Sequence, residues 1–167
     1  MSKNIIQKIN AKILDCAAMK IRVANWRSQG YSIVFTNGCF DLLHKGHISY
    51  LAEAAELGDK LIIGVNADAS VQELKGMDRP IKNLENRQFI LASLESVDAV
   101  VAFEEETPIK LIEKAMPDFL VKGGDWQPDQ IVGSELVLQN GGEVISLPFI
   151  EGHSTTNIIE KIMGRKK

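Results

Sequence analysis

The chain alternates short apolar runs with longer segments of helical periodicity, and this alternation constrains its fold more than any other feature. Five apolar-rich runs are expected to be strands: 32–36 (SIVFT), 60–65 (KLIIGV), 99–103 (AVVAF), 119–122 (FLVK) and 143–147 (EVISL). The runs are nearly continuous, which is typical of strands buried on both faces. We therefore predict an α/β fold in which helices cover both faces of a five-stranded parallel sheet, with right-handed crossovers.

The stretches between these runs carry the start and stop signals of helices. They predict helices that begin near His47, after Asn83, at Pro108, near Ile131 and after Ser154. Asparagine and serine at the residue before a helix accept hydrogen bonds from free amides of the first turn, and proline suits a first helical position. Strands and helices therefore alternate along the chain, as a parallel sheet requires.

The first thirty residues are expected to be helical. Ile5, Ile9 and Ile13 recur at helical spacing, and Asp15 is placed to cap a second helix that ends at Gly30. We predict one domain over 1–167, with this helical extension over 1–30, the core over 31–163 and a tail over 164–167.

Composition excludes several classes of protein. The 167 residues are 45% hydrophobic and 25% charged, which predicts one globular domain, and the net charge of −3 opposes general binding to nucleic acid or membrane surfaces. Two cysteines do not make a disulfide framework or a zinc cluster. The chain has no apolar run near the roughly 20 residues of a membrane span, and its first residues lack the apolar core of a signal peptide. A cytoplasmic protein is expected.

The segment 37–47 (NGCFDLLHKGH) follows the first predicted strand and is the main candidate site. Ligands of parallel sheets bind beyond the carboxyl ends of the strands. Gly38 lets backbone approach a ligand, and His44 and His47 lie at a helix start, where free amides favour anions. Two ordinary surface histidines, or a metal site short of ligands, are the alternatives. Position favours phosphate contact, although the segment is neither a Walker loop nor a G-x-G-x-x-G fingerprint.

Polar residues also follow the other predicted strands. After the fourth strand, 122–126 (KGGDW) contains two glycines that suit close approach to a flat base. After the fifth strand, 154–156 (STT) opens the last helix, where phosphate contact is favoured over a simple cap. The loop 71–83 after the second strand is expected to be a mobile flap that carries Lys75 and Arg79.

Three motifs resemble one enzyme family. TNGCFDLLHKGH resembles the signature of the cytidylyltransferase-like nucleotidyltransferases, which share an H-x-G-H element with class I aminoacyl-tRNA synthetases. LPFIEGHSTTNIIEKI resembles their second signature, and VDAVVAFEEETPIKLIEKAMPDFLVKGGDW is similar to the adenylyltransferase subgroup of ADP-heptose synthesis. The resemblance covers 30–163 and implies a Rossmann-like nucleotidyltransferase fold.

The resemblance also implies roles for individual residues. Catalytic roles are implied for His44, His47 and Lys75. Contacts with the nucleotide are implied for Asn37, Gly38, Cys39, Phe40, Lys122, Gly124, Asp125, Ser154, Thr155 and Thr156. Contacts with the second substrate are implied for Asp41, Arg79, Arg87 and Trp126. Structural alternatives stay open for two of these residues, because Asp41 is placed to cap the helix near His44 and Trp126 is suited to plain packing.

Members of the family join a nucleoside triphosphate to a phosphorylated substrate and release pyrophosphate. For the heptose branch, the resemblance implies ATP with Mg²⁺, D-glycero-β-D-manno-heptose 1-phosphate, and ADP-heptose for the lipopolysaccharide core. It also implies a homodimer and a separate sugar kinase in the same pathway. The alternative is a cytidylyltransferase acting on glycerol 3-phosphate, whose arginine before the last helix is replaced here by Phe149. Phenylalanine cannot donate a hydrogen bond to a cytosine carbonyl, so adenine is favoured.

Two other classes of function are less consistent with the sequence. A regulatory nucleotide-binding module without catalysis is expected to have lost some of His44, His47 and Lys75, which are all present. An RNA-binding relative of the synthetases needs a basic face, which the net charge of −3 does not favour. We therefore expect no nucleic-acid or membrane partner.

Overall fold

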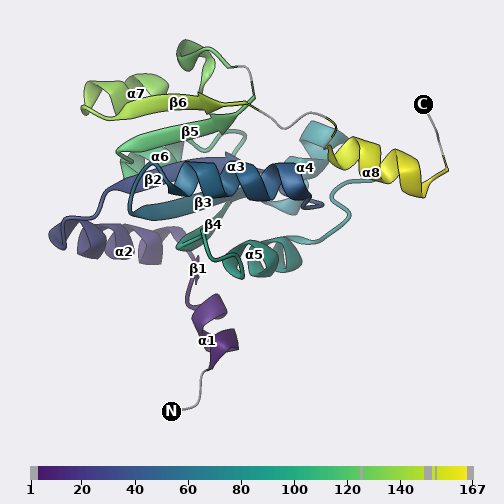
Figure 1. Cartoon of the computed structure of the whole chain (residues 1–167), viewed down its shortest axis with the longest axis horizontal. Helices are drawn as coiled ribbons and strands as arrows, with labels where there is room; N and C mark the ends of the chain where they lie inside the picture. The colour runs from purple at the N-terminus through teal and green to yellow at the C-terminus, as the bar shows by residue number, and fades with distance from the viewer. Residues whose placement is uncertain (1–3, 125, 149–151, 153, 165–167) are drawn as a thin grey trace.

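A parallel sheet forms the centre of the molecule, which we describe from a computed structural model (Figure 1). The model describes residues 4–124, 126–148, 152 and 154–164, so Asp125 and Phe149 lie outside the described residues. Within these residues the sheet has six strands in the order β1-β4-β3-β2-β5-β6. The strands are β1 (Ile13–Leu14), β2 (Ile33–Gly38), β3 (Lys60–Asn66), β4 (Ala99–Phe103), β5 (Phe119–Gly123) and β6 (Glu143–Leu147).

The expected parallel sheet is confirmed, but the predicted number of five strands is wrong. The additional strand, β1, pairs Ile13 with Val100 and Leu14 with Val101 at the edge beside β4. The sequence pattern predicts a helix at Ile13, because this residue continues a helical spacing of isoleucines. A strand of two residues is too short to show a period of its own, and its neighbour in the sheet comes from a distant part of the chain.

Helices cover both faces of the sheet, as predicted. One face packs against α1 (Ile5–Asn10), α3 (Lys45–Ala55) and α5 (Leu84–Ala92), and the other against α2 (Cys16–Ser28), α6 (Ile109–Ala115) and α7 (Ser134–Gln139). None of the described helices has the length and apolar character needed to span a bilayer. The two layers explain the continuous apolar runs, because alternate side chains of a strand enter different cores. In β2, Ile33 and Phe35 enter one core and Val34 the other, all fully buried.

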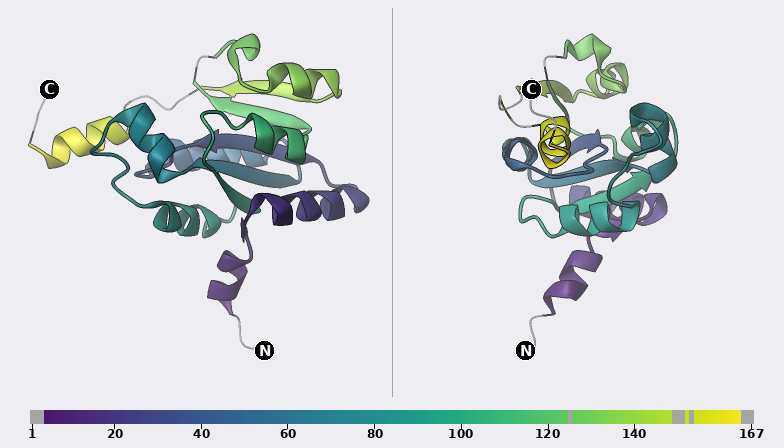
Figure 2. Two further views of the ribbon diagram at one scale, coloured as in Figure 1. Left: turned by 180° about the vertical axis from the view of Figure 1, so that it is seen from behind. Right: turned by 90° about the vertical axis from the view of Figure 1, so that its right-hand side faces the viewer.

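Two further helices lie beyond the carboxyl ends of the strands (Figure 1). They are α4 (Asp68–Lys75), directly after β3, and α8 (Thr155–Ile162), which lies in front of the sheet when the molecule is viewed from that end (Figure 2). The first part of the predicted flap 71–83 is therefore helical, and Lys75 is the last residue of α4 rather than a loop residue. The glycine, proline and charged residues of this segment favour a loop in the sequence. The structure instead has a short helix there, whose Val71 side chain is fully buried.

The order of the strands creates a crevice beside β2. The chain passes from β2 to β3 on one side, and later crosses through α6 to β5 on the other side. Such a reversal leaves the loops after the two central strands diverging, so that a ligand can enter between them. Phe35 of β2 pairs with Leu120 of β5, and three residues further along each strand come Gly38 and Gly123. Both glycines therefore lie at this opening.

Carboxylates hold the strands together at the opposite, amino-terminal edge of the sheet. The Asp118 carboxylate, just before β5, accepts a hydrogen bond of 2.7 Å from the amide of the buried Ile33 in β2, and pairs at 3.3 Å with Arg27 of α2. Asp98 does the same for the amide of Leu61 in β3. Each carboxylate thus satisfies an amide at a strand start, where the ladder offers no acceptor.

We predict that Asp118→Ala lowers the free energy of unfolding by about 1–3 kcal/mol, because the buried Ile33 amide loses its acceptor. Glu113→Ala, on the exposed side of α6, is the matched control and should change stability by less than about 0.5 kcal/mol. Chemical denaturation of the two variants measures the difference. Equal stabilities would contradict this role of Asp118.

Candidate functional site

A cavity of about 690 Å³ opens at the carboxyl ends of β2, β3 and β5. Most of the residues predicted for the site line it: Asn37, Gly38, Cys39, Phe40, Asp41, His47, Lys75, Arg79, Lys122, Trp126, Thr155 and Thr156. His44, Arg87, Gly124 and Ser154 are described but do not belong to the lining, and Asp125 lies outside the described residues. Segments far apart in the sequence therefore converge on one hollow.

The loop after β2 passes close to the cavity in an unusual conformation. Phe40 has a φ of 49°, in the left-handed region that bulky residues rarely adopt. Its ring lies where a side chain on Gly38 would be, since a Cβ at that position would come within 3.0 Å of the ring. A side chain at position 38 would therefore require the Phe40 ring to shift. Backbone strain of this kind is concentrated at functional sites.

The two histidines of the H-x-G-H element stack on each other. The ring centroids of His44 and His47 are 3.9 Å apart with 27° between the planes, and the Phe40 ring meets His47 edge-on at 5.6 Å. Burial, and then the neighbouring His44, lower the pKa of His47 to about 4. The His47 ring is therefore neutral at pH 7 and can donate one N–H to an anion without carrying a charge. His44 supports this ring from behind, at the residue before α3.

Cationic side chains surround the same hollow. Lys122, at the end of β5, is partly buried and lies 3.4 Å from the amide oxygen of Asn37. Burial lowers the pKa of the Lys122 ammonium, with a small opposing effect from Cys39. Lys75 approaches from the end of α4 and Arg79 from the segment that follows. An anionic ligand would replace the water that a buried ammonium has lost, so the cavity is suited to phosphate.

Asp41 is a clamp rather than a helix cap. Its buried carboxylate accepts hydrogen bonds from Arg79 Nε at 2.6 Å and from the amides of Ile81 and Lys82 at 2.8 and 2.9 Å. Burial alone would raise the pKa of this carboxyl, but the two amides and Arg79 lower it below its usual value. The structural alternative that Asp41 caps the helix near His44 is wrong, because its acceptors are used by the segment before α5.

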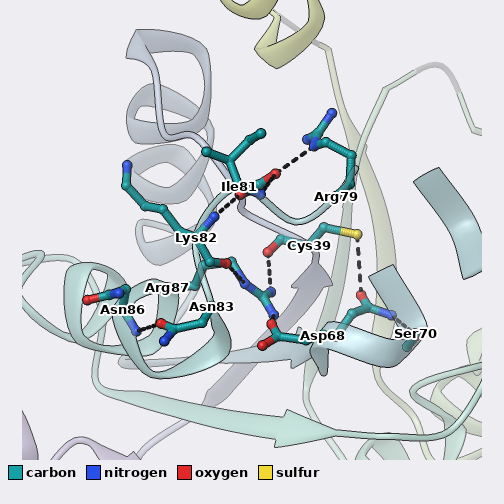
Figure 3. A network of polar contacts seen from close by, with 11 residues as sticks. Cys39, Asp68, Ser70, Arg79, Ile81, Lys82, Asn83, Asn86 and Arg87 are labelled. Atoms are coloured by element: carbon teal, nitrogen blue, oxygen red, sulfur yellow. Dashed lines mark hydrogen bonds and ion pairs between the residues drawn. The ribbon is translucent and has the colours of Figure 1, made fainter. Parts of the chain in front are cut away.

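Arg87 of α5 lies beneath the site and is 1% exposed (Figure 3). Its Nη1 donates to the carbonyl of Cys39 at 2.6 Å, its Nη2 to Asp68 at 2.7 Å and its Nε to the carbonyl of Lys82 at 3.0 Å (Figure 3). The structure thus engages Arg87 with the protein itself. The substrate contact expected for Arg87 stays a prediction, and it would require one of these bonds to be exchanged.

The remaining predicted residues frame the ends of the cavity. Trp126 is 45% exposed while its indole nitrogen donates to the carbonyl of Gly123 at 3.1 Å, so the ring is held in place with a free face. The Thr155 hydroxyl donates to the carbonyl of Leu42 at 3.1 Å and draws the start of α8 against the loop after β2. Ser154 caps α8 by accepting from the Asn157 amide, which is the simpler of its two expected roles.

Sequence reasoning missed several lining residues: Tyr50, Asn66, Leu74, Glu106, Thr107, Pro108 and Val132. The rule that polar residues after a strand face the site also applies to β4, and would have found Glu106 and Thr107. Tyr50 carries no such signal, because its hydroxyl reaches the cavity floor from inside α3, 2.6 Å from the Thr36 hydroxyl. Burial raises the pKa of Tyr50 to about 12, so this hydroxyl stays protonated.

The arrangement brings hydrogen-bond donors and cationic side chains together in one cavity. Within the described ranges, no cluster of three or more His, Cys, Asp or Glu side chains is placed to hold a metal ion.

Curated proteins from two bacteria are similar to this chain. Bifunctional protein HldE of Escherichia coli O139:H28 is 56% identical over 149 residues, which are 89% of this chain and 31% of that protein. Bifunctional protein HldE of Citrobacter koseri is 57% identical over 150 residues, which are 90% and 31%. The chain therefore spans about a third of the length of the curated relatives that it matches.

Solved structures share the fold. The lipopolysaccharide core biosynthesis protein from Thermoplasma volcanium superposes with a TM-score of 0.60 and 28% identity, covering 74% of this chain and all of that chain. Pantothenate synthetase from Thermus thermophilus has a TM-score of 0.61 at 15% identity, covering 92% and 69%, which shows the fold alone. The Rossmann-like fold expected from the sequence is confirmed. Since the cytidylyltransferase-like family model matches residues 35–161, most of its length, this chain belongs to the cytidylyltransferase-like family.

Proposed function

We propose that this protein transfers AMP from ATP to a sugar 1-phosphate and releases pyrophosphate. The observation that carries the proposal is the neutral His47 at the start of α3, which shares one cavity with Lys75 and Lys122. A cavity with these donors and cations can hold a triphosphate and a second phosphate together. A protein that only binds a nucleotide would not need a buried, neutral histidine stacked on a second histidine.

The chemistry needs few groups from the protein. A phosphate oxygen of the sugar 1-phosphate attacks the α-phosphorus of ATP, and the bond from that phosphorus to the β-phosphate oxygen breaks. The attacking oxygen is already ionised, so no general base is required. Catalysis then consists of alignment and of stabilising charge on the α-phosphate, which hydrogen-bond donors and lysines supply. Mg²⁺, when bound to ATP, neutralises part of the phosphate charge.

The nucleotide fits the β2–β5 side of the cavity. Gly123 and the exposed face of the Trp126 ring suit a flat base. The loop after β2 would bring its backbone near the ribose and the α-phosphate. His47 and the start of α8 at Thr155 would contact the triphosphate. The positions of these groups in the cavity support the roles expected for the nucleotide-binding residues.

The sugar is proposed to be D-glycero-β-D-manno-heptose 1-phosphate, which makes ADP-heptose the product. Similarity to Bifunctional protein HldE and to a lipopolysaccharide core biosynthesis protein supports this choice over glycerol 3-phosphate. The bifunctional relatives extend well beyond the part matched here, which supports a sugar kinase as the supplier of the substrate. We also propose a homodimer in the cytoplasm, where ATP is available.

A matrix of nucleotides and phosphorylated acceptors tests the proposal. We expect pyrophosphate release with ATP and the heptose 1-phosphate, and kcat/KM lower with CTP by about 5- to 150-fold, because a cytosine carbonyl would lack a donor. Pyrophosphate release is measured by a coupled assay. A higher kcat/KM with CTP and glycerol 3-phosphate would overturn the heptose assignment in favour of the cytidylyltransferase alternative.

We predict that His47→Ala lowers kcat by about 10²–10³, the usual effect of losing one donor to the charge of a transition state. His44→Ala removes the ring stacked on His47 and should lower kcat through the misplaced His47 ring. The melting temperature should change little. Lys45→Ala is the matched control, because Lys45 lies between the histidines but is exposed and outside the cavity lining. Near-normal kcat in either histidine variant would refute its assignment.

We predict that ATP raises the pKa of His47 from about 4, because a nearby triphosphate favours the protonated ring. NMR titration of the ring protons, assigned with His47→Gln, measures this shift. In the free protein, the unfolded chain binds more protons between pH 6.5 and 4, so His47 makes stability fall as the pH drops through that window. His47→Gln should therefore lose less stability than the wild type over the same range. A His47 that titrates near 6.5 without ATP would contradict the burial argument.

A further inference from the structure

One carboxylate in the lining of the cavity has no partner among the described residues. It belongs to Glu106, in the connection between β4 and α6. Among the described residues, Glu106 has no hydrogen-bond or ion-pair partner, whereas the neighbouring Glu105 pairs with Lys110 at 3.0 Å and does not line this cavity. Two adjacent acids of the same loop thus have different surroundings.

Glu106 differs in the same way from Asp41, the other acidic residue in the described lining. Asp41 is neutralised by Arg79 and by two amides, so it has no capacity left for a ligand. Glu106 adds a carboxyl group without such partners among the described residues to a cavity that is otherwise lined by cationic side chains and donors. A free carboxylate repels phosphate, so its ligand must present a neutral or positive donor.

The order of the strands places Glu106 at one end of the bound substrates. β4 is separated from β2 by β3, and neighbouring strands lie about 4.8 Å apart, so the end of β4 is roughly 10 Å from that of β2. The proposed base site beside Trp126 follows β5, on the other side of β2. The phosphates at His47 occupy the middle. With the base after β5 and the phosphates near His47, the acceptor sugar is the part of the substrates that would lie at the end of β4.

We propose that Glu106 accepts hydrogen bonds from hydroxyl groups of the acceptor sugar and selects polyhydroxylated sugar phosphates. This inference rests on the proposed function and adds a side chain that recognises the sugar. An ionised carboxylate is an acceptor only, and it makes strong charge-assisted bonds with hydroxyl donors. Thr107 lines the cavity beside it and offers a second polar group at the same end.

Glu106→Gln tests the proposal, with Glu105→Gln as the matched control in the same loop. We expect Glu106→Gln to raise KM for heptose 1-phosphate by about 10- to 100-fold, the cost of weakening a charge-assisted bond, and to leave KM for ATP within about twofold. Glu105→Gln should change neither constant. With monodeoxy analogues of the heptose 1-phosphate, the effect of Glu106→Gln should disappear for the analogue that lacks the contacted hydroxyl. Thermal melting checks that both variants are folded, as expected for side chains at the surface.

The other outcomes overturn the inference. Equal KM for the sugar phosphate in the two variants would show that Glu106 does not contact the sugar. A raised KM for ATP would assign Glu106 to the nucleotide, and recovery of activity in excess Mg²⁺ would assign it to the metal. An inactive wild-type protein, by contrast, would refute the proposed function itself, and the sugar-binding role with it.

Discussion

The buried guanidinium of Arg87 holds together the three segments on which the site is built. A positive charge that is 1% exposed must find acceptors, and Arg87 finds them in Cys39 after β2, Asp68 at the start of α4 and Lys82 before α5. Removing any one acceptor would leave a buried donor unsatisfied, so the three segments keep a common geometry. The left-handed turn at Phe40, directly after Cys39, is supported by this network.

Asp41 adds a second connection between the same segments. It binds Arg79 and the amides of Ile81 and Lys82, so the chain after Lys75 is tied back to the loop after β2. The polar atoms of Arg87 and Asp41 are bonded within the protein, so neither side chain needs a ligand as a partner. Arg79 and Arg87 are therefore paired with carboxylates of the protein. Lys75 and Lys122 have no such carboxylate partner among the described residues and line the cavity, where we propose that they contact phosphates.

Burial shapes the electrostatics of the cavity. It lowers the pKa of His47 and of Lys122, so both groups hold their protons less tightly than in water. A triphosphate bound as proposed would reverse this effect, because its negative charge favours the protonated forms. In the proposed complex, phosphate would offset part of the desolvation cost of these two groups. Glu106, outside this cationic centre, gives the opposite end of the cavity a different preference.

The sequence by itself determined the parallel sheet from β2 to β6, because each of these strands is buried on both faces and shows it as a continuous apolar run. It also placed His47, Lys122 and Thr155 at one edge, since residues after parallel strands gather there. Only the tertiary structure decided that Ile13–Leu14 is a strand and that Arg87 is buried. The partner of Ile13 is Val100, and Arg87 bonds to a carbonyl 48 residues away. A local pattern records the burial of a segment, but contacts between distant segments depend on how the whole chain packs.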